Sequence, residues 1–535
     1  MASDFPWLTV IGAVPLVGAI AVMIVPHGRA ELAKRLALLT SLVTVGLVIA
    51  MASRFRSGTP GYQFAEKHEW IPAFGVNYAL GVDGIALVLI ALATILVPVV
   101  ILASWHDADP VATTARFGAA AELPPKRPVR TFFALILVLE TMMVGVFAAT
   151  DVFLFYVFFE AMLIPMYFLI GSFGGPRRSY AAVKFLLYSL FGGLLMLAAV
   201  IALFVVARSQ LGFGTFDIAT LATAVKDGQL VIDPVVEKLL FAGFFIAFAI
   251  KAPLVPFHTW LPDAAAEATP GSAVLLVGVL DKVGTFGMLR YCLLLFPAAS
   301  QYFTPMIIVL AVVGILYGAL LAIGQTDIKR LIAYTSISHF GFIALGVFAF
   351  TTQSQSGSTL YMVNHGFSTA ALFLIAGFLI SRGGSRLIGD YGGVQSAAPL
   401  LAGTFLIAGL STLSLPGLSP FVSEFLVLVG TFSRYQVAAV LGTLGVILAA
   451  VYVLWLYQRA MNGPVAGRAR GLTDLNRREL WAVVPLLAVI VGLGFYPQPV
   501  LNVINPAVTS TLDHVGTTDP KPTVDTAASV EETQP

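Results

Sequence analysis

The stretch LLFAGFFIAFAIKAPLVPFHTWLPDA, residues 239–264, determines what kind of fold this chain can adopt. Twelve uncharged residues precede Lys251, so this lysine falls near the middle of a segment that is apolar enough to cross a membrane. Pro253, Pro256 and His258 follow it directly. A proline removes a backbone donor and frees a carbonyl one turn earlier, which a membrane tolerates only where protein or a hydrated cavity encloses the break. The stretch therefore predicts an interrupted membrane helix around a buried cation.

The composition of the whole chain is that of a membrane protein. Of its 535 residues, 58% are hydrophobic and 11% are charged, whereas soluble domains average about 25% charged residues. The mean hydropathy is +0.91. A single cysteine, Cys292, excludes a disulfide or an iron–sulfur ligand set within the chain. The N-terminal MASDFPW carries an acid where a signal peptide carries lysine or arginine, so we expect the first apolar run to remain as a helix.

Apolar windows of roughly 20 residues predict fourteen membrane spans and hence an all-α polytopic membrane protein. The spans lie near 6–25, 35–53, 82–104, 130–149, 151–171, 180–207, 236–261, 271–296, 302–324, 328–349, 358–381, 397–433, 437–460 and 480–499. We expect one membrane domain over 1–504 and no soluble domain. The tail 505–535 is rich in Thr, Pro, Asp and Glu and is predicted to be disordered.

The distribution of basic residues predicts the orientation of the chain. If the N-terminus lies outside, eighteen of the thirty lysines and arginines fall in cytoplasmic loops and seven on the opposite side, as the positive-inside rule requires. Both ends of the chain are then expected on the outer, periplasmic side of a bacterial plasma membrane. The irregular loop 105–129 is expected on the cytoplasmic side.

Several ionisable residues remain inside the predicted spans. Lys238 and Arg290 lie near span ends, where a long side chain can reach the interface. Lys184 is about one turn inside its span, so a structural and a functional role are both open there. The ionisable residues at or near mid-depth are Lys251, Lys282, Glu140, Glu160, Glu424, His339 and His365.

Seven ionisable residues at mid-depth need an explanation, because each costs about 2.5–3.5 kcal/mol even on the lenient insertion scale. Any one of them can form a static ion pair that ties two helices together. Acids, lysines and histidines spread over seven spans favour a proton relay instead. In general, burial lowers the pKa of a lysine and a nearby carboxylate raises it. A buried lysine with a movable acidic partner can therefore load and release a proton.

A second interrupted helix is predicted in LSLPGLSPFVSEF, residues 413–425, where Pro416, Gly417 and Pro420 precede Glu424. Each break falls in the fourth of five consecutive spans, over 130–296 and 302–460. Paired broken helices in two halves of a chain are typical of transporters, and an odd number of spans inverts the second half. The pattern predicts two inverted five-helix repeats.

Four segments resemble the antiporter-like, Mrp-related proton-pumping membrane subunits of respiratory complex I, NADH–quinone oxidoreductase. They are FYVFFEAMLIPMYFLIGSFGG (155–175), FFIAFAIKAPLVPFHTWLPDAAAEATPGSAVLL (244–276), DIKRLIAYTSISHFGF (327–342) and MVNHGFSTAALFLIAGFL (362–379). The resemblance covers about residues 75–460. Glu424 favours the branch of the family with a glutamate in the twelfth helix, because the sister subunits L and N usually carry a lysine there. We also expect no long lateral helix after the last span, unlike subunit L.

The resemblance implies a proton pathway. Its residues would be Glu160, Lys251, Lys282, His339, His365 and Glu424, with His258, Glu140 and Lys184 as secondary candidates. A contact between Glu160 and Lys251 that switches on and off would drive the proton by way of Lys282 towards Glu424 and the outside. Glu140 and Asp281 match no family-wide motif. Because adjacent positions of a helix point about 100° apart, Asp281 can face a different neighbour from Lys282.

The resemblance also implies partners and cofactors. The chain would work as a translocase subunit of NADH:quinone oxidoreductase, beside the other membrane-arm subunits and especially L and N. NADH, FMN, iron–sulfur clusters and quinone are expected in those other subunits. No redox site, metal site or nucleic-acid interface can be found in this sequence.

Other functions remain open from the sequence alone. The same helix set occurs in multisubunit sodium/proton antiporters and membrane-bound hydrogenases. A passive scaffold would keep the ion pairs and move nothing. Haem ligation by His339 and His365 and ordinary solute transport are further alternatives.

Overall fold

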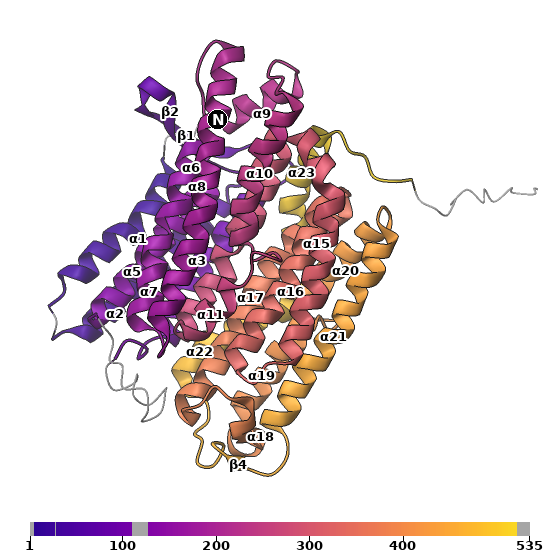
Figure 1. Ribbon diagram of the computed structural model, residues 1–535. Coiled ribbons are helices and arrows are strands. Elements are labelled where there is room, and N and C mark those ends of the chain that lie inside the picture. Colours follow the sequence, from indigo (N-terminus) through magenta and orange to yellow (C-terminus); the bar gives the residue numbers. More distant parts are fainter. Residues whose placement is uncertain (1–4, 27, 110–126, 522–535) are drawn as a thin grey trace, which may run out of the picture.

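The computed structural model describes residues 5–26, 28–109 and 127–521, and these are largely helical (Figure 1). The N-terminal part contains α1 (Trp7–Ile24), α2 (Ala30–Ala52), β1 (Gln63–Ile71), η1 (Pro72–Phe74), β2 (Val76–Val82), α3 (Gly84–Ala103), α5 (Val129–Ala148), α6 (Val152–Ala161), α7 (Leu163–Phe173), α8 (Arg178–Leu211) and α9 (Ile218–Lys226). Next come α10 (Pro234–Lys251), α11 (Trp260–Glu267), α12 (Pro270–Leu275), η2 (Leu276–Leu280), α13 (Lys282–Gly287), η3 (Met288–Cys292) and α14 (Leu293–Leu295).

The C-terminal part is also mostly helical. It contains α15 (Pro297–Ile323), α16 (Ile328–Phe348), α17 (Thr352–Gly383), η4 (Ile388–Asp390), β3 (Tyr391–Gly392), α18 (Val394–Ala397), α19 (Pro399–Thr412), α20 (Ser419–Phe432), α21 (Gln436–Met461), β4 (Ala466–Gly467), α22 (Arg477–Phe495) and α23 (Gln498–Val515).

The predicted all-helical membrane fold is confirmed. Twelve helices in the described residues are long and apolar enough to span a membrane, and they coincide with twelve of the fourteen predicted spans. The other two predicted spans are the interrupted ones, which the structure divides into α10 and α11 and into α19 and α20. The pair of inverted repeats remains a prediction.

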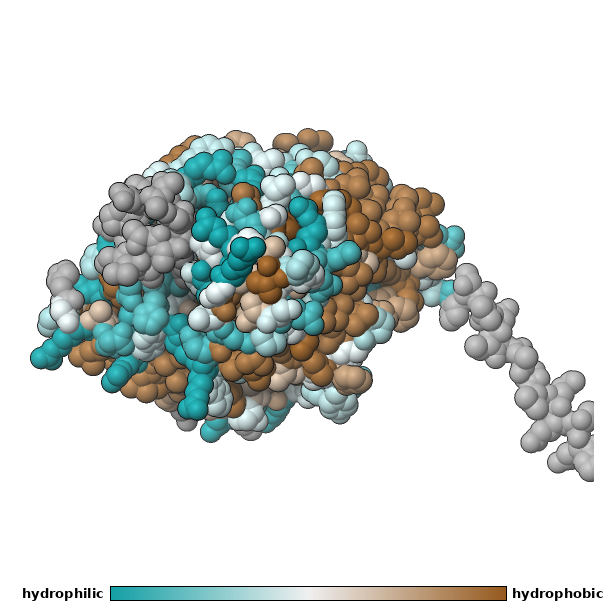
Figure 2. Space-filling view, turned by 90° about the horizontal axis from the view of Figure 1, so that it is seen from below, coloured by the Kyte–Doolittle hydropathy of each residue, from teal (hydrophilic) through white to brown (hydrophobic). Residues whose placement is uncertain are grey.

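The helices stand side by side in one bundle (Figure 1). Its upper end carries β1, β2, α9 and both ends of the described chain, and its lower end carries α18 and β4. The two ends of the described chain thus lie at one end of the bundle, and their orientation in the membrane stays a prediction. Figure 2 shows the lower end, where hydrophilic residues gather over the middle and left and hydrophobic residues cover the right.

Burial separates a central group of helices from an outer layer. The apolar windows of α17 and of 270–295 are completely buried, and that of α16 nearly so. A helix that is buried all round belongs to the core of a large protein. The outer helices α1, α2, α8, α21 and α22 instead expose large apolar side chains, as a lipid-facing layer requires. The central helices are therefore the ones shielded from lipid.

The first break is held together by a tryptophan. α10 ends at Lys251 and α11 begins at Trp260, whose indole Nε1 donates a 2.9 Å hydrogen bond to the carbonyl of Ile250. This bond satisfies a carbonyl near the point where the helix ends, and unsatisfied carbonyls are costly in a membrane. The Val255–Pro256 peptide bond in between is cis.

The second break is held by neighbouring helices. Asn364 of α17 donates a 2.7 Å hydrogen bond to the carbonyl of Ser419, where α20 begins. Gly417 has a φ of +92° and lies directly against Gly494 of α22. A side chain at Gly494 would collide with the carbonyl oxygen of Gly417. Glycine tolerates both the positive φ and the close approach.

Two elements differ from the sequence-based expectation. The predicted disordered tail begins at 505, yet α23 continues to Val515 and packs against α3 and α17, so residues 505–515 are helical. Residues 522–535 lie outside the described part. The antiparallel pair β1 and β2 was not predicted. Most of the 105–129 loop, residues 110–126, also lies outside the described residues.

Candidate functional site

Glu160 lies in the last turn of α6, immediately before the short irregularity at Met162 that separates α6 from α7. Its carboxylate packs against Gly193 of α8, because a Cβ built at Gly193 would overlap the carboxylate. The absence of a side chain on Gly193 therefore creates the space that the acid occupies.

Lys251 is the last residue of α10 and is only 1% exposed. Its Nζ lies 4.6 Å from the ring centroid of Phe159, a cation–π contact of a kind that contributes roughly 0.5–2 kcal/mol. The ammonium has no hydrogen-bond partner among the described residues. It is close enough to Glu160 to interact electrostatically, but Lys251 Nζ and Glu160 Oε1 form no hydrogen bond with each other in the described residues. The structure brings the predicted pair together and leaves it open.

Lys282 begins α13, directly after the π-helical turn η2. Its Nζ lies 2.5 Å from the carbonyl of Val277 and 2.7 Å from Nδ1 of His365 in α17. Single π-helical turns are frequent at functional sites. Here the turn leaves the carbonyl of Val277, five residues back, within reach of the lysine. Lys282 and His365 thus form a direct polar contact in the centre of the bundle.

A row of rings continues from His365. The ring of His339 in α16 lies 5.2 Å from that of His365, at right angles to it. The ring of Tyr361 lies 5.7 Å from His339. Tyr361 and Tyr452 of α21 both interact electrostatically with Glu424 of α20. The ring of Tyr361 also lies 6.4 Å from that of His365, so the three rings form a cluster. The predicted residues Lys282, His365, His339 and Glu424 therefore belong to one group of neighbouring side chains, called the row below, together with two tyrosines that were not predicted.

The secondary candidates lie elsewhere. Glu140 of α5 is completely buried, and neither carboxylate oxygen has a hydrogen-bond partner among the described residues. Lys184 of α8 forms a 2.7 Å ion pair with Asp263 of α11, which also binds Arg330 at 2.8 Å. His258 lies in the first break, 5.3 Å from the ring of Tyr317. Among the described residues, no hydrogen bond, ion pair or ring contact joins these three to Lys282, His365, His339 or Glu424.

Two basic residues are placed differently from the sequence-based expectation. Arg290 was expected to reach the interface, but it is 6% exposed and forms an ion pair with Asp83, beside Thr511 of α23. Lys329 was expected in a loop, but its Nζ is buried and donates to the carbonyls of Ala266 and Ala268 at the end of α11. A lysine at the carbonyl end of a helix is favourable. Both cations hold helices together.

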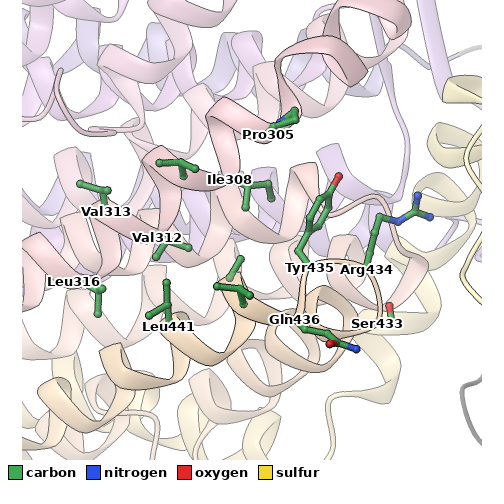
Figure 3. Close-up of a pocket in the computed structure, with 13 residues that line it drawn as sticks. Pro305, Ile308, Val312, Val313, Leu316, Ser433, Arg434, Tyr435, Gln436 and Leu441 are labelled. Carbon is green, nitrogen blue, oxygen red and sulfur yellow. The ribbon is translucent and has the colours of Figure 1, made fainter.

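One apolar groove is separate from all these charges. It has a volume of about 720 Å³ and lies between α15 and α21 (Figure 3). Ile308, Val312 and Leu441 line it, and Arg434 lies at one end, where its guanidinium donates to the carbonyl of Thr518. No candidate site residue lines this groove. Among the residues that the structure describes, no cluster of three His, Cys, Asp or Glu side chains is arranged to hold a metal ion.

Comparison with known proteins identifies the family. The family model described as NADH:quinone oxidoreductase/Mrp antiporter matches residues 149–449. NADH-quinone oxidoreductase subunit M of Mycobacterium tuberculosis is 57% identical over 98% of this chain and 97% of its own length. A chain of respiratory complex I from Thermus thermophilus, solved with bound NADH, is 30% identical and superposes with a TM-score of 0.83 over 95% of this chain and all of that one.

A third comparison concerns the fold alone. A chain of the Mrp complex from Dietzia sp. superposes with a TM-score of 0.78 over 95% of this chain and 97% of that one, at 22% identity. The antiporter architecture is thus shared more widely than the sequence. The Mycobacterium tuberculosis relative is named subunit M and not L or N, which agrees with the branch that the sequence favours. The chain belongs to the family of NADH-quinone oxidoreductase subunit M, the antiporter-like proton-translocating membrane subunits of complex I.

Proposed function

We propose that protons move through this chain along a buried row of side chains from Glu160 and Lys251, by way of Lys282 and His365, to Glu424. The strongest support is the 2.7 Å approach of Lys282 Nζ to His365 Nδ1. Proton transfer requires a donor and an acceptor within hydrogen-bond distance or joined through one water. The contact also joins the two predicted five-helix repeats, because α13 lies within 130–296 and α17 within 302–460.

The open pair of Glu160 and Lys251 acts as the switch at one end of this row. When the carboxylate approaches the ammonium, it stabilises the protonated lysine; when it withdraws, it leaves a buried cation that gains from releasing its proton. The aromatic ring of Phe159, next to Glu160 in the chain, is the contact that Lys251 keeps in the open arrangement. A small rotation of α6 would therefore move both the carboxylate of Glu160 and the ring of Phe159 relative to Lys251.

The far end of the row leads from His365 to Glu424. The ring spacings of 5.2 and 5.7 Å along His365, His339 and Tyr361 are suited to transfer through bridging waters, which count as hydrogen-bond partners. Glu424 follows the second break, and we assign it the release of the proton towards the upper end. With the predicted orientation, the upper end is the periplasmic side.

Energy for this transfer comes from outside the chain. Moving one proton against 100 mV takes about 2.3 kcal/mol. We assign NADH oxidation, FMN, the iron–sulfur clusters and quinone to other subunits of the complex, and the sister subunits L and N to its immediate neighbours. The coupling must then reach Glu160 and Lys251 through contacts along the membrane arm.

The test is alanine substitution of Lys251 and of Lys282 in the assembled complex. We expect each variant to lower NADH-driven proton uptake into inverted membrane vesicles about tenfold or more, the size of effect that loss of a general acid–base group produces. Uptake is followed with a pH-sensitive dye, with and without added sodium ions. The amount of assembled complex is measured by NADH oxidation with an artificial electron acceptor.

Lys238→Ala provides the matched control. Lys238 is a partly exposed lysine of the same helix, α10, and its Nζ rests 3.6 Å from the ring centroid of Tyr302. We expect the complex with Lys238→Ala to take up protons at the same rate as the unsubstituted complex. If the Lys251 and Lys282 variants assemble and also pump normally, the row is a scaffold and the proposal is wrong.

A further inference from the structure

Asp281 is a buried acid to which the row described above gives no role. It lies between η2 and α13 and is 0% exposed. Neither carboxylate oxygen has a hydrogen-bond partner among the described residues. A buried carboxylate without a partner is strongly unfavourable, so its presence in the centre of the bundle calls for an explanation.

The packing of α13 shows which way Asp281 faces. Gly284 follows three positions later, about 60° around the helix, and so lies on the same side as Asp281, whereas Gly287 lies about 60° further round. A Cβ at Gly284 would lie 2.7 Å from the backbone nitrogen of Ala252, and one at Gly287 would overlap the ring of Phe248. This face therefore packs directly against the last turn of α10, which carries Lys251.

Lys282 faces a different neighbour. It is one position further along the helix, which turns the side chain by about 100°, and it meets His365 of α17. Asp281 is close enough to interact electrostatically with both Lys282 and Lys251. The acid therefore has both lysines in its surroundings, one on its own helix and one on α10.

We propose that Asp281 relays the proton from Lys251 to Lys282. The inference rests on the proposed function and adds a step to it. The ammonium of Lys251 loses a proton, and the carboxylate of Asp281 gains it as an O–H bond forms. The resulting carboxylic acid then gives its proton to the amine of Lys282, which passes one to Nδ1 of His365. Each step breaks one N–H or O–H bond and forms another, so that no oxidant or further reactant is needed.

The charge arrangement favours this route. Two lysines that exchange a proton directly repel each other whenever both are charged, and like charges in a low-dielectric interior are costly. A carboxylate between them offsets that repulsion and offers an acceptor to the first lysine and a donor to the second. The charged groups that face Asp281 are Lys251 from α10 and Lys282 from its own helix, and Glu160 approaches Lys251 from α6.

The test is Asp281→Asn in the assembled complex. The amide has nearly the same shape but cannot carry the proton, so we expect NADH-driven proton uptake into inverted vesicles to fall about tenfold or more. Asp281→Glu keeps the carboxyl group and should restore most of the uptake. Thr285→Val is the packing control: Thr285 is also completely buried in α13, and its hydroxyl donates to the carbonyl of Lys282.

The solvent isotope effect on proton uptake separates a relay from a structural role of Asp281. With Asn at 281, transfer must pass through water alone and becomes slower than the steps around it. The ratio of uptake rates in H₂O and D₂O should therefore rise above the parent value, whereas a purely structural defect leaves that ratio unchanged. An unchanged ratio, or parental uptake by assembled D281N complex, overturns the inference.

The outcomes also separate this inference from the proposed function. If Lys251→Ala and Lys282→Ala abolish uptake while D281N pumps like the parent, only the relay through Asp281 is wrong. If all three pump like the parent, the proposed function itself fails. Should D281N not assemble, the pH profile of uptake by D281E decides: a shifted profile supports a titrating relay, and an unchanged profile overturns it.

Discussion

At the scale of single residues, the site depends on a glycine as much as on its acids and bases. Gly193 of α8 leaves the space in which the carboxylate of Glu160 lies. Gly193→Ala should push that carboxylate out of place, and a misplacement of about 1 Å can cost about a hundredfold in rate. We expect the complex to assemble and its proton uptake, measured in inverted vesicles, to fall by up to about a hundredfold.

Gly403→Ala tests whether the effect at Gly193 is local. Gly403 also lies within a helix, α19, but a Cβ there meets nothing within 4 Å. Alanine is a better helix former than glycine, so this variant should pump normally and be slightly more stable. Equal loss of uptake in both variants would contradict a specific role for Gly193.

The residues of the site differ in how visible they are in the sequence. A charge within an apolar run is conspicuous, so Glu160, Lys251 and Lys282 could be predicted from one window each. Gly193 and Tyr361 could not, because glycines and tyrosines are ordinary in membrane helices and their role follows from which helix they pack against. Asp281 stands out in the sequence as an acid beside Lys282, but the direction of its side chain follows only from the packing of α13 on α10.

At the scale of elements, the first broken helix depends on the indole of Trp260. Trp260→Phe keeps an aromatic ring, although a smaller one, and removes the donor to the carbonyl of Ile250. A buried carbonyl left unsatisfied costs about 1–3 kcal/mol. We expect a lower midpoint in thermal unfolding of the purified complex and reduced proton uptake, because the end of α10 positions Lys251. Trp481→Phe, at a tryptophan that is 73% exposed, should change neither.

The elements that were missed have identifiable physical reasons. Prolines mark both breaks, so the interrupted helices were visible in the sequence. α23 was missed because its composition is polar, although Ile504, Val508, Leu512 and Val515 recur at helical spacing and are all buried. The pair β1 and β2 was missed because the exposed segment QFAEKHEWI alternates only weakly between polar and apolar residues.

At the scale of the whole molecule, one buried ion pair joins three distant parts of the chain. Arg290 at η3 pairs with Asp83, the N-cap of α3, and also donates to Thr511 of α23. Breaking a buried pair by removing one partner costs about 3–5 kcal/mol, because a charge is left buried and uncompensated. Asp83→Asn should therefore lower the thermal midpoint of the purified complex strongly, and the double variant with Arg290→Gln should recover part of that loss.

The ion pair of Lys67 with Asp217 has an exposed lysine, so Lys67→Gln should cost about 0.2–1 kcal/mol. Equal shifts for Asp83→Asn and Lys67→Gln would show that the buried pair does not hold these segments together.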